Sequence, residues 1–157
     1  MIMVETIGQI EKLAIGDGAI KAKSGGTKNG FVGTVASGVV ANASTDGLGL
    51  KIFENYAKGD ESYEWDTVVA SGDLMTGWNV DVYKGKNLRV SPNSITYATG
   101  ANYASITEGT TLMGAGTDGN LTIIEDASNI ATGGVYFKVI KKINFGGNGV
   151  LAEVVVK

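Results

Sequence analysis

Several residue types that carry much of protein chemistry are missing or scarce in this chain of 157 residues. It contains no cysteine and no histidine, and it has one proline, Pro92, and one arginine, Arg89. Without cysteine there is no disulfide framework, no thiolate zinc site and no cysteine nucleophile. Without histidine there is no Ser-His-Asp triad and no histidine general base, and nearly every catalytic zinc site is excluded. We therefore expect a protein that is not an enzyme, with no catalytic, cofactor-binding or metal-binding residues.

Positive charge and long apolar runs are also scarce. The chain has 13 basic and 16 acidic residues and a formal net charge of -3. Nucleic-acid binding needs a basic surface to neutralise phosphates, and arginine is the residue that reads bases best. No apolar run approaches the length that spans a bilayer. We therefore expect neither nucleic acid nor a membrane as a partner.

Glycine, by contrast, is abundant. The chain has 24 glycines, and 43% of its residues are hydrophobic. Many glycines scattered among Val, Ile and Thr are typical of a β-protein with many turns. The length fits one domain of ordinary size, which is long enough to bury a core without disulfides.

The clearest pattern is a β-hairpin at residues 135–157. Apolar residues recur at every second position on both sides of the Gly/Asn-rich segment 144–149, which predicts strand, turn and strand. One face is formed by Val135, Phe137 and Val139 before the turn and by Val150, Ala152, Val154 and Val156 after it. Because the opposite face also carries apolar residues, we expect the hairpin to be central in its sheet.

Further strands are predicted at residues 31–40, 68–70, 78–83, 88–90 and 121–124, where β-branched and aromatic residues lie between turn signals. Residues 1–30 read as an N-terminal arm that ends in a flexible, glycine-rich segment, and residues 31–157 as the β-domain. The predicted fold class is mainly β: a single glycine-rich β-sandwich or barrel-like domain with an extended N-terminal arm.

The segment Gly114 to Gly119 matches the pattern GxGxxG. A dinucleotide site needs a helix after this motif, because the helix N-terminus receives the pyrophosphate. Here the following residues, Asn120 to Ile124, favour a strand. We therefore interpret the motif as a glycine-rich turn.

An acidic and aromatic stretch occupies residues 54–66. Its carboxylates Asp60, Glu61, Glu64 and Asp66 are interpreted as a solvated face, with a glycosidase pair or a calcium loop as the alternatives. The aromatic residues Tyr63, Trp65 and Trp78 are candidates for an exposed sugar-binding platform. Trp and Tyr at strand spacing are more often core or interface residues.

Three segments carry a resemblance to a known class of proteins. They are IKAKSGGTKNGFVG at 20–33, GDLMTGWNVDV at 72–82 and VLAEVVVK at 150–157. In these segments the chain resembles head decoration (cement) proteins and similar small capsid-associated proteins of tailed bacteriophages. The resemblance implies a β-rich protein on the outside of an icosahedral shell, often a trimer, with an arm lying on neighbouring capsid subunits. It implies no active-site residues.

From this resemblance we expect a non-enzymatic virion structural protein that binds the exterior of a phage capsid and stabilises it. The expected partners are the major capsid protein and further copies of the chain, with a trimer as the suggested oligomer. The candidate capsid-interface residues are Ile20, Lys21, Lys23, Lys28 and Phe31, in which the lysines meet an acidic capsid surface. The alternative is a phage tail or fibre module that recognises cell-surface glycans through Trp65 and Trp78.

Overall fold

The computed structural model describes residues 2–5, 20–55 and 68–157, and for residues 2–5 it describes the backbone alone. Nearly all regular structure in these ranges is β-strand, and the helices there are three single 3-10 turns: η1 (Asp81–Tyr83), η2 (Pro92–Ser94) and η3 (Tyr103–Ser105). The mainly-β prediction is confirmed.

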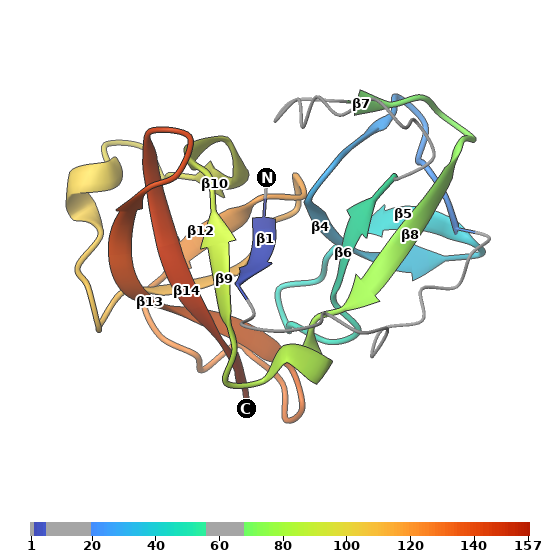
Figure 1. The fold of residues 1–157 in the computed structure, drawn as a ribbon. Coiled ribbons are helices and arrows are strands. Elements are labelled where there is room, and N and C mark those ends of the chain that lie inside the picture. Colours follow the sequence, from blue (N-terminus) through green and yellow to red (C-terminus); the bar gives the residue numbers. More distant parts are fainter. Residues whose placement is uncertain (1, 6–19, 56–67) are drawn as a thin grey trace.

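The strands form a large sheet and a closed barrel that lie side by side (Figure 1). The sheet has seven strands in the order β1 (Ile2–Glu5), β9 (Asn87–Val90), β14 (Asn148–Val156), β13 (Val135–Asn144), β11 (Leu112–Ala115), β12 (Leu121–Ile124) and β10 (Ile95–Thr96). The barrel consists of β2 (Ile20–Lys21), β5 (Val39–Asn42), β4 (Phe31–Ala36), β6 (Lys51–Glu54) and β8 (Leu74–Asn79). A separate pair joins β3 (Thr27–Lys28) to β7 (Val68–Val69). Part of the chain thus forms a barrel, as the predicted fold class allows.

The C-terminal hairpin lies at the centre of the large sheet, as predicted. Strand β13 pairs with β11 and β14, and β14 pairs with β13 and β9. Every residue of the predicted inner face is buried except Val156, which is half-buried. The register shifts between Val139 and Lys141, so that Ile140 forms a bulge. A bulge leaves one residue without a cross-strand partner, and the Ile140 side chain is accordingly exposed.

Two predicted strands are wrong in their extent. Residues 31–40 are two strands, β4 and β5, joined at Ser37 and Gly38, whose φ angles are 50° and 75°. Positive φ at both central residues makes the tight hairpin turn that suits twisted strands. The predicted strand 78–83 ends at Asn79 and continues as η1. In a 3-10 helix residues i and i+3 lie on one side, so Val80 and Tyr83 are buried while Val82 is exposed.

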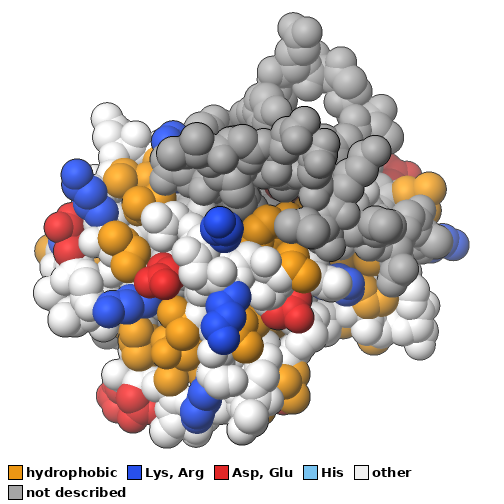
Figure 2. Space-filling model, turned by 60° about the horizontal axis from the view of Figure 1, so that its bottom comes forward, with side chains coloured by type: hydrophobic (Ala, Val, Ile, Leu, Met, Phe, Trp, Pro, Cys, Tyr) orange, Lys and Arg blue, Asp and Glu red, His pale blue; other side chains and the backbone are white. Residues whose placement is uncertain are grey.

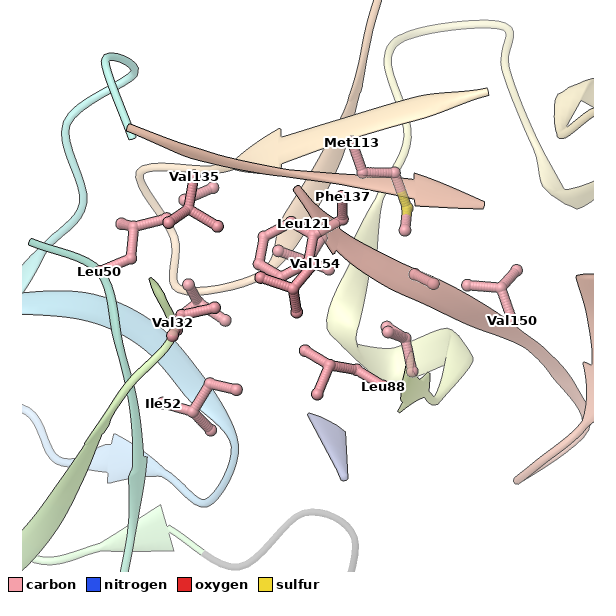
Figure 3. Close-up of a cluster of buried hydrophobic side chains, with 14 of the residues drawn as sticks. Val32, Leu50, Ile52, Leu88, Met113, Leu121, Val135, Phe137, Val150 and Val154 are labelled. Carbon is pink, nitrogen blue, oxygen red and sulfur yellow. The ribbon is translucent and has the colours of Figure 1, made fainter. Parts of the chain in front are cut away.

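A shared core joins the barrel to the sheet. Val32, Leu50 and Ile52 come from the barrel and its loop, and they lie in one cluster with Leu121, Val135 and Phe137 of the sheet, as Figure 3 shows. The barrel interior holds a second cluster, formed by Ile20, Ala22, Phe31, Val40, Phe53, Val69 and Met75. Strands β4 and β6 therefore bury both faces, one inside the barrel and one against the sheet.

The predicted boundary at residue 30 stays a prediction, because residues 6–19 lie outside the described residues. On either side of that gap the chain is in strands. Backbone pairing adds β1 antiparallel to β9 at an edge of the large sheet. Strand β2 belongs to the barrel, and β3 pairs with β7.

Candidate functional site

Residues 20–28 run antiparallel to residues 68–75 along one side of the barrel. Strand β2 pairs with β8, and β3 pairs with β7. From the first pair of strands to the second, the register shifts by only one residue. Between the two pairs, Ala22 N donates to Asp73 O at 2.8 Å and Gly72 N donates to Ala22 O at 3.1 Å. The two segments therefore form one irregular two-stranded ladder.

The exposed side chains of this ladder include two lysines opposite two aliphatic residues, one such pair at each end. Lys21 lies directly opposite Leu74, and Lys28 lies directly opposite Val68. Directly opposed residues in antiparallel strands are near enough for their side chains to touch. All four are exposed, Leu74 by 56% and Val68 by 51%. We call Lys21, Lys28, Val68 and Leu74 the lysine–aliphatic surface.

The structure divides the five candidate interface residues into exposed and buried ones. Lys21 and Lys28 are exposed and belong to the lysine–aliphatic surface. Ile20 and Phe31 are buried in the barrel core, because each side chain points inward from its strand. Lys23 is half-buried: its Nζ donates to Asn42 Oδ1 at 2.9 Å and lies 4.2 Å from the centroid of the Phe31 ring. That these five residues contact a capsid stays a prediction.

A pocket of about 240 Å³ adjoins the lysine–aliphatic surface. On one side it is lined by the β2–β4 segment, including Lys23 and Lys28, and by Val68. On the other side it is lined by Asn93 and Ser94 of η2 and by the turn Asp118–Asn120. The pocket therefore lies where the barrel meets the large sheet.

The turn of the GxGxxG segment forms the sheet side of this pocket. It connects β11 to β12, which pair antiparallel, so the interpretation as a glycine-rich turn is confirmed. Gly119 has a φ of +86°, and its carbonyl accepts a hydrogen bond from Val32 N at 2.8 Å. A Cβ at this position would lie 2.0 Å from the Phe31 ring. Only glycine permits both the backbone conformation and this contact.

Asp118 holds the turn to the neighbouring strand. Its carboxylate accepts hydrogen bonds from Thr96 Oγ1 at 2.5 Å, from Asn120 N at 3.1 Å and from Asn120 Nδ2 at 3.3 Å. Burial by itself raises the pKa of this carboxyl, but the hydrogen bonds outweigh it and hold the pKa below its usual value. Asp118 therefore places a negative charge on the sheet side of the pocket, and its carboxylate is already hydrogen-bonded to Thr96 and Asn120.

A second, more open hollow lies beside the tip of the C-terminal hairpin, next to Tyr103 and Lys142. The Tyr103 hydroxyl donates to Gly149 O at 3.0 Å, and Lys142 Nζ lies 4.9 Å from the Tyr103 ring centroid. Burial, and then the charge of Glu108, raises the pKa of Tyr103. Both polar groups are engaged in holding the hairpin tip, so we do not assign a site here.

The predicted surface aromatic residues are placed only in part. Trp78 is half-buried and packs against the core cluster shared by barrel and sheet, which is the usual place for Trp on a strand. Tyr63 and Trp65 lie outside the described residues, as do the carboxylates Asp60, Glu61, Glu64 and Asp66. The glycan-binding alternative therefore gains no support from the geometry of Trp78.

In the described part of the chain, no group of three or more His, Cys, Asp or Glu side chains lies close enough to hold a metal ion. None of the helices described is long and apolar enough to cross a bilayer.

On the face shown in Figure 2, basic and acidic side chains are scattered singly among apolar ones.

Sequence reasoning missed Val68, Leu74 and Asp118. Val68 and Val69 are adjacent and identical, and only the pairing with β3 decides that Val68 points outward and Val69 inward. Asp118 was recognised as part of a turn, but its hydrogen-bond partner Thr96 and the pocket residue Lys28 are far away in the sequence. The only available signal for Asp118 was that an Asp before a Gly often bonds to the backbone of its own turn.

The chain was compared with models of protein families, with curated proteins and with solved structures, and none of these matched.

Proposed function

We propose that this chain is a non-enzymatic structural protein of a tailed-phage virion, which binds the exterior of the capsid and stabilises it. Its partners are the major capsid protein and further copies of itself, most simply as a trimer. The observation that carries the proposal is the lysine–aliphatic surface, in which Lys21, Lys28 and Leu74 belong to two of the three segments that resemble capsid-associated proteins.

The composition of this surface suits a protein partner. Leu74 and Val68 each keep more than half of their side chain in water, and covering such residues is favourable by about 25 cal/mol per Å². Lys21 and Lys28 add positive charge to a chain whose net charge is -3, so this face differs in sign from the protein as a whole. Such a face attracts an acidic surface that carries apolar residues.

Modest contacts of this kind are sufficient for a capsid protein. A stabilising protein that is present in many copies binds across subunit boundaries, and a protein that binds only the assembled shell shifts the equilibrium toward that shell. If the copies form an oligomer, each further contact on the same shell is intramolecular and strengthens the whole attachment. High affinity at each single contact is therefore unnecessary.

Co-sedimentation with capsid shells tests the proposal. The shells are assembled from the major capsid protein of the same genome, and the test variant is Lys21→Glu with Leu74→Ser. The matched control is Lys84→Glu with Val82→Ser, which likewise reverses one lysine charge and replaces one exposed aliphatic residue by serine, in the η1 region. We expect wild type and control to bind alike, and the test variant to bind about tenfold more weakly, equivalent to about 1.4 kcal/mol.

Quantitative mass spectrometry of purified virions gives an independent measure. A shell component is present in hundreds of copies per particle, whereas a tail component is present in a handful. Absence of shell binding by the wild type, together with a low copy number, would rule out the proposal.

A further inference from the structure

We propose that the pocket between barrel and sheet binds the carboxylate side chain of an Asp or Glu residue on the partner protein, next to an apolar residue. This inference rests on the proposed function and names the chemistry by which the lysine–aliphatic surface recognises its partner.

The size of the pocket fits one side chain. Its volume of about 240 Å³ lies below the roughly 300–1,000 Å³ of pockets that enclose small molecules. Its barrel and sheet walls are joined by the contact of Gly119 with the Phe31 ring and by the hydrogen bond from Val32 N to Gly119 O. The pocket is therefore formed before any partner arrives, and little ordering is required on binding.

Two lysine side chains supply hydrogen-bond donors on the barrel side of the pocket. Lys28 is exposed and makes no side-chain hydrogen bond or ion pair with the described residues. The Lys23 ammonium has three N–H groups, of which one is accounted for by Asn42 Oδ1. Two lysines lining one pocket therefore favour a ligand that accepts hydrogen bonds and carries negative charge.

The opposite wall restricts how such a ligand enters. Asp118 already accepts bonds from Thr96 and Asn120, so three of its roughly four acceptor positions are occupied. Its negative charge repels a second carboxylate. The ligand carboxylate therefore lies against Lys28 and Lys23 and away from the turn at Asp118.

The exposed Val68 beside the pocket is the reason for an apolar partner residue next to the ligand carboxylate. Val68 lies at the rim opposite Lys28 on the adjacent strand, and it is half exposed. Gly26 lies directly against it: a Cβ on Gly26 would be 2.6 Å from Val68 Cγ1. An apolar residue beside the ligand carboxylate would cover Val68 while the carboxylate reaches the lysines.

A small probe tests the pocket without any capsid. N-acetylglutamate methylamide is titrated into the ¹⁵N-labelled full chain while the backbone amides of Gly25, Gly26 and Gly119 are followed by NMR. N-acetylglutamine methylamide, which has the same shape and no charge, is the control ligand. We expect saturable shifts with the glutamate probe, and weakening of about five- to tenfold in Lys28→Glu but none in Lys84→Glu. Equal shifts with both probes, or no shifts, would overturn the proposal.

Shell binding by the same variants separates this inference from the proposed function. If shells bind Lys28→Glu as well as they bind wild type, the pocket assignment fails while the proposed function stands. If shells do not bind the wild type, the proposed function fails, and the probe titration still decides whether the pocket accepts a carboxylate.

A last variant tests whether the pocket binds a carboxylate of this chain rather than one of a partner. The acidic segment lies just before Val68 in sequence, and its charges are removed by D60N, E61Q, E64Q and D66N. If the glutamate probe binds this variant but not the wild type, the pocket accepts the chain's own segment, which overturns the assignment to a partner. Similar binding to both supports the proposal.

Discussion

At the scale of single residues, one turn decides how barrel and sheet meet. Gly119 lies directly against the Phe31 ring and accepts a hydrogen bond from Val32, while Asp118 bonds to Thr96 of β10. Gly119 thus sets how closely the two parts approach, and Asp118 fixes the turn on the sheet. Two predictions follow from these contacts.

Gly119→Ala is expected to lower the free energy of unfolding by about 2–5 kcal/mol, because it combines the cost of positive φ with overpacking against Phe31. Urea denaturation followed by circular dichroism measures the loss. Gly133→Ala is the matched control, since Gly133 has a φ of +81° but no atom within 4 Å of an added Cβ. Its expected loss is only the conformational cost of about 1–2 kcal/mol. Equal losses would show that the contact with Phe31 is unimportant.

Asp118→Asn is expected to change the pH dependence of stability. The pKa of Asp118 is lower in the folded protein than in the unfolded chain, where it is about 4. Its stabilising contribution is therefore complete above about pH 4 and is lost as the pH falls through the folded-state pKa. In urea titrations, wild type should be more stable than Asp118→Asn at neutral pH, and the difference should shrink on acidification. A difference that is constant with pH would contradict this.

At the scale of elements, the C-terminal hairpin supplies the centre of the sheet, and the ladder of residues 20–28 with 68–75 supplies the exposed face. In both, residues close together in the sequence differ sharply in exposure. In β13, Phe137 is fully buried, whereas Ile140 at the bulge is exposed. In the ladder, Val69 is buried and Val68 is exposed.

Phe137→Ala is expected to destabilise the protein by about 3–5 kcal/mol, because it removes a large buried side chain and leaves a cavity. Ile140→Ala should cost about 1 kcal/mol or less, since Ile140 is already 37% exposed to water. Urea denaturation of both variants measures the difference. If Phe137→Ala does not fold, Phe137→Leu is measured instead, because it removes less of the buried side chain and leaves a smaller cavity. A loss well above about 1 kcal/mol for Ile140→Ala would contradict its assignment to the exposed face.

At the scale of the whole molecule, one core joins two assemblies of strands. Val32 and Ile52 belong to the barrel by their backbone pairing, but their side chains pack with Leu121, Val135 and Phe137 of the sheet. Neither assembly can therefore lose its structure without exposing the core of the other.

We therefore expect barrel and sheet to unfold in a single transition. Tryptophan fluorescence, to which Trp78 of the barrel strand β8 contributes, should give the same urea midpoint as far-UV circular dichroism, which reports on all strands. Ile52→Ala should move both midpoints together, by a loss of about 2–5 kcal/mol. Two separate midpoints, or a shift in one signal only, would show that the assemblies unfold independently.

The sequence alone was sufficient for the mainly-β class, the C-terminal hairpin and the turn at the GxGxxG segment. In each case the information is local: side chains alternate with a period of two along a strand, and glycine marks the positions where φ is positive. The same locality limited the other predictions. Alternation at Trp78, Val80 and Val82 does not reveal that the chain becomes a 3-10 turn after Asn79, because the turn depends on what Val80 and Tyr83 pack against.

Only the tertiary structure decided where the candidate site lies. The lysines at 21 and 28 were visible in the sequence, but their aliphatic neighbours at 74 and 68 are brought to them by strand pairing across 53 and 40 positions. The pocket needs a further contact, that of Gly119 with Phe31, which joins the barrel to the sheet. Local patterns determine which residues form strands; the pairing of distant strands determines which side chains share a surface.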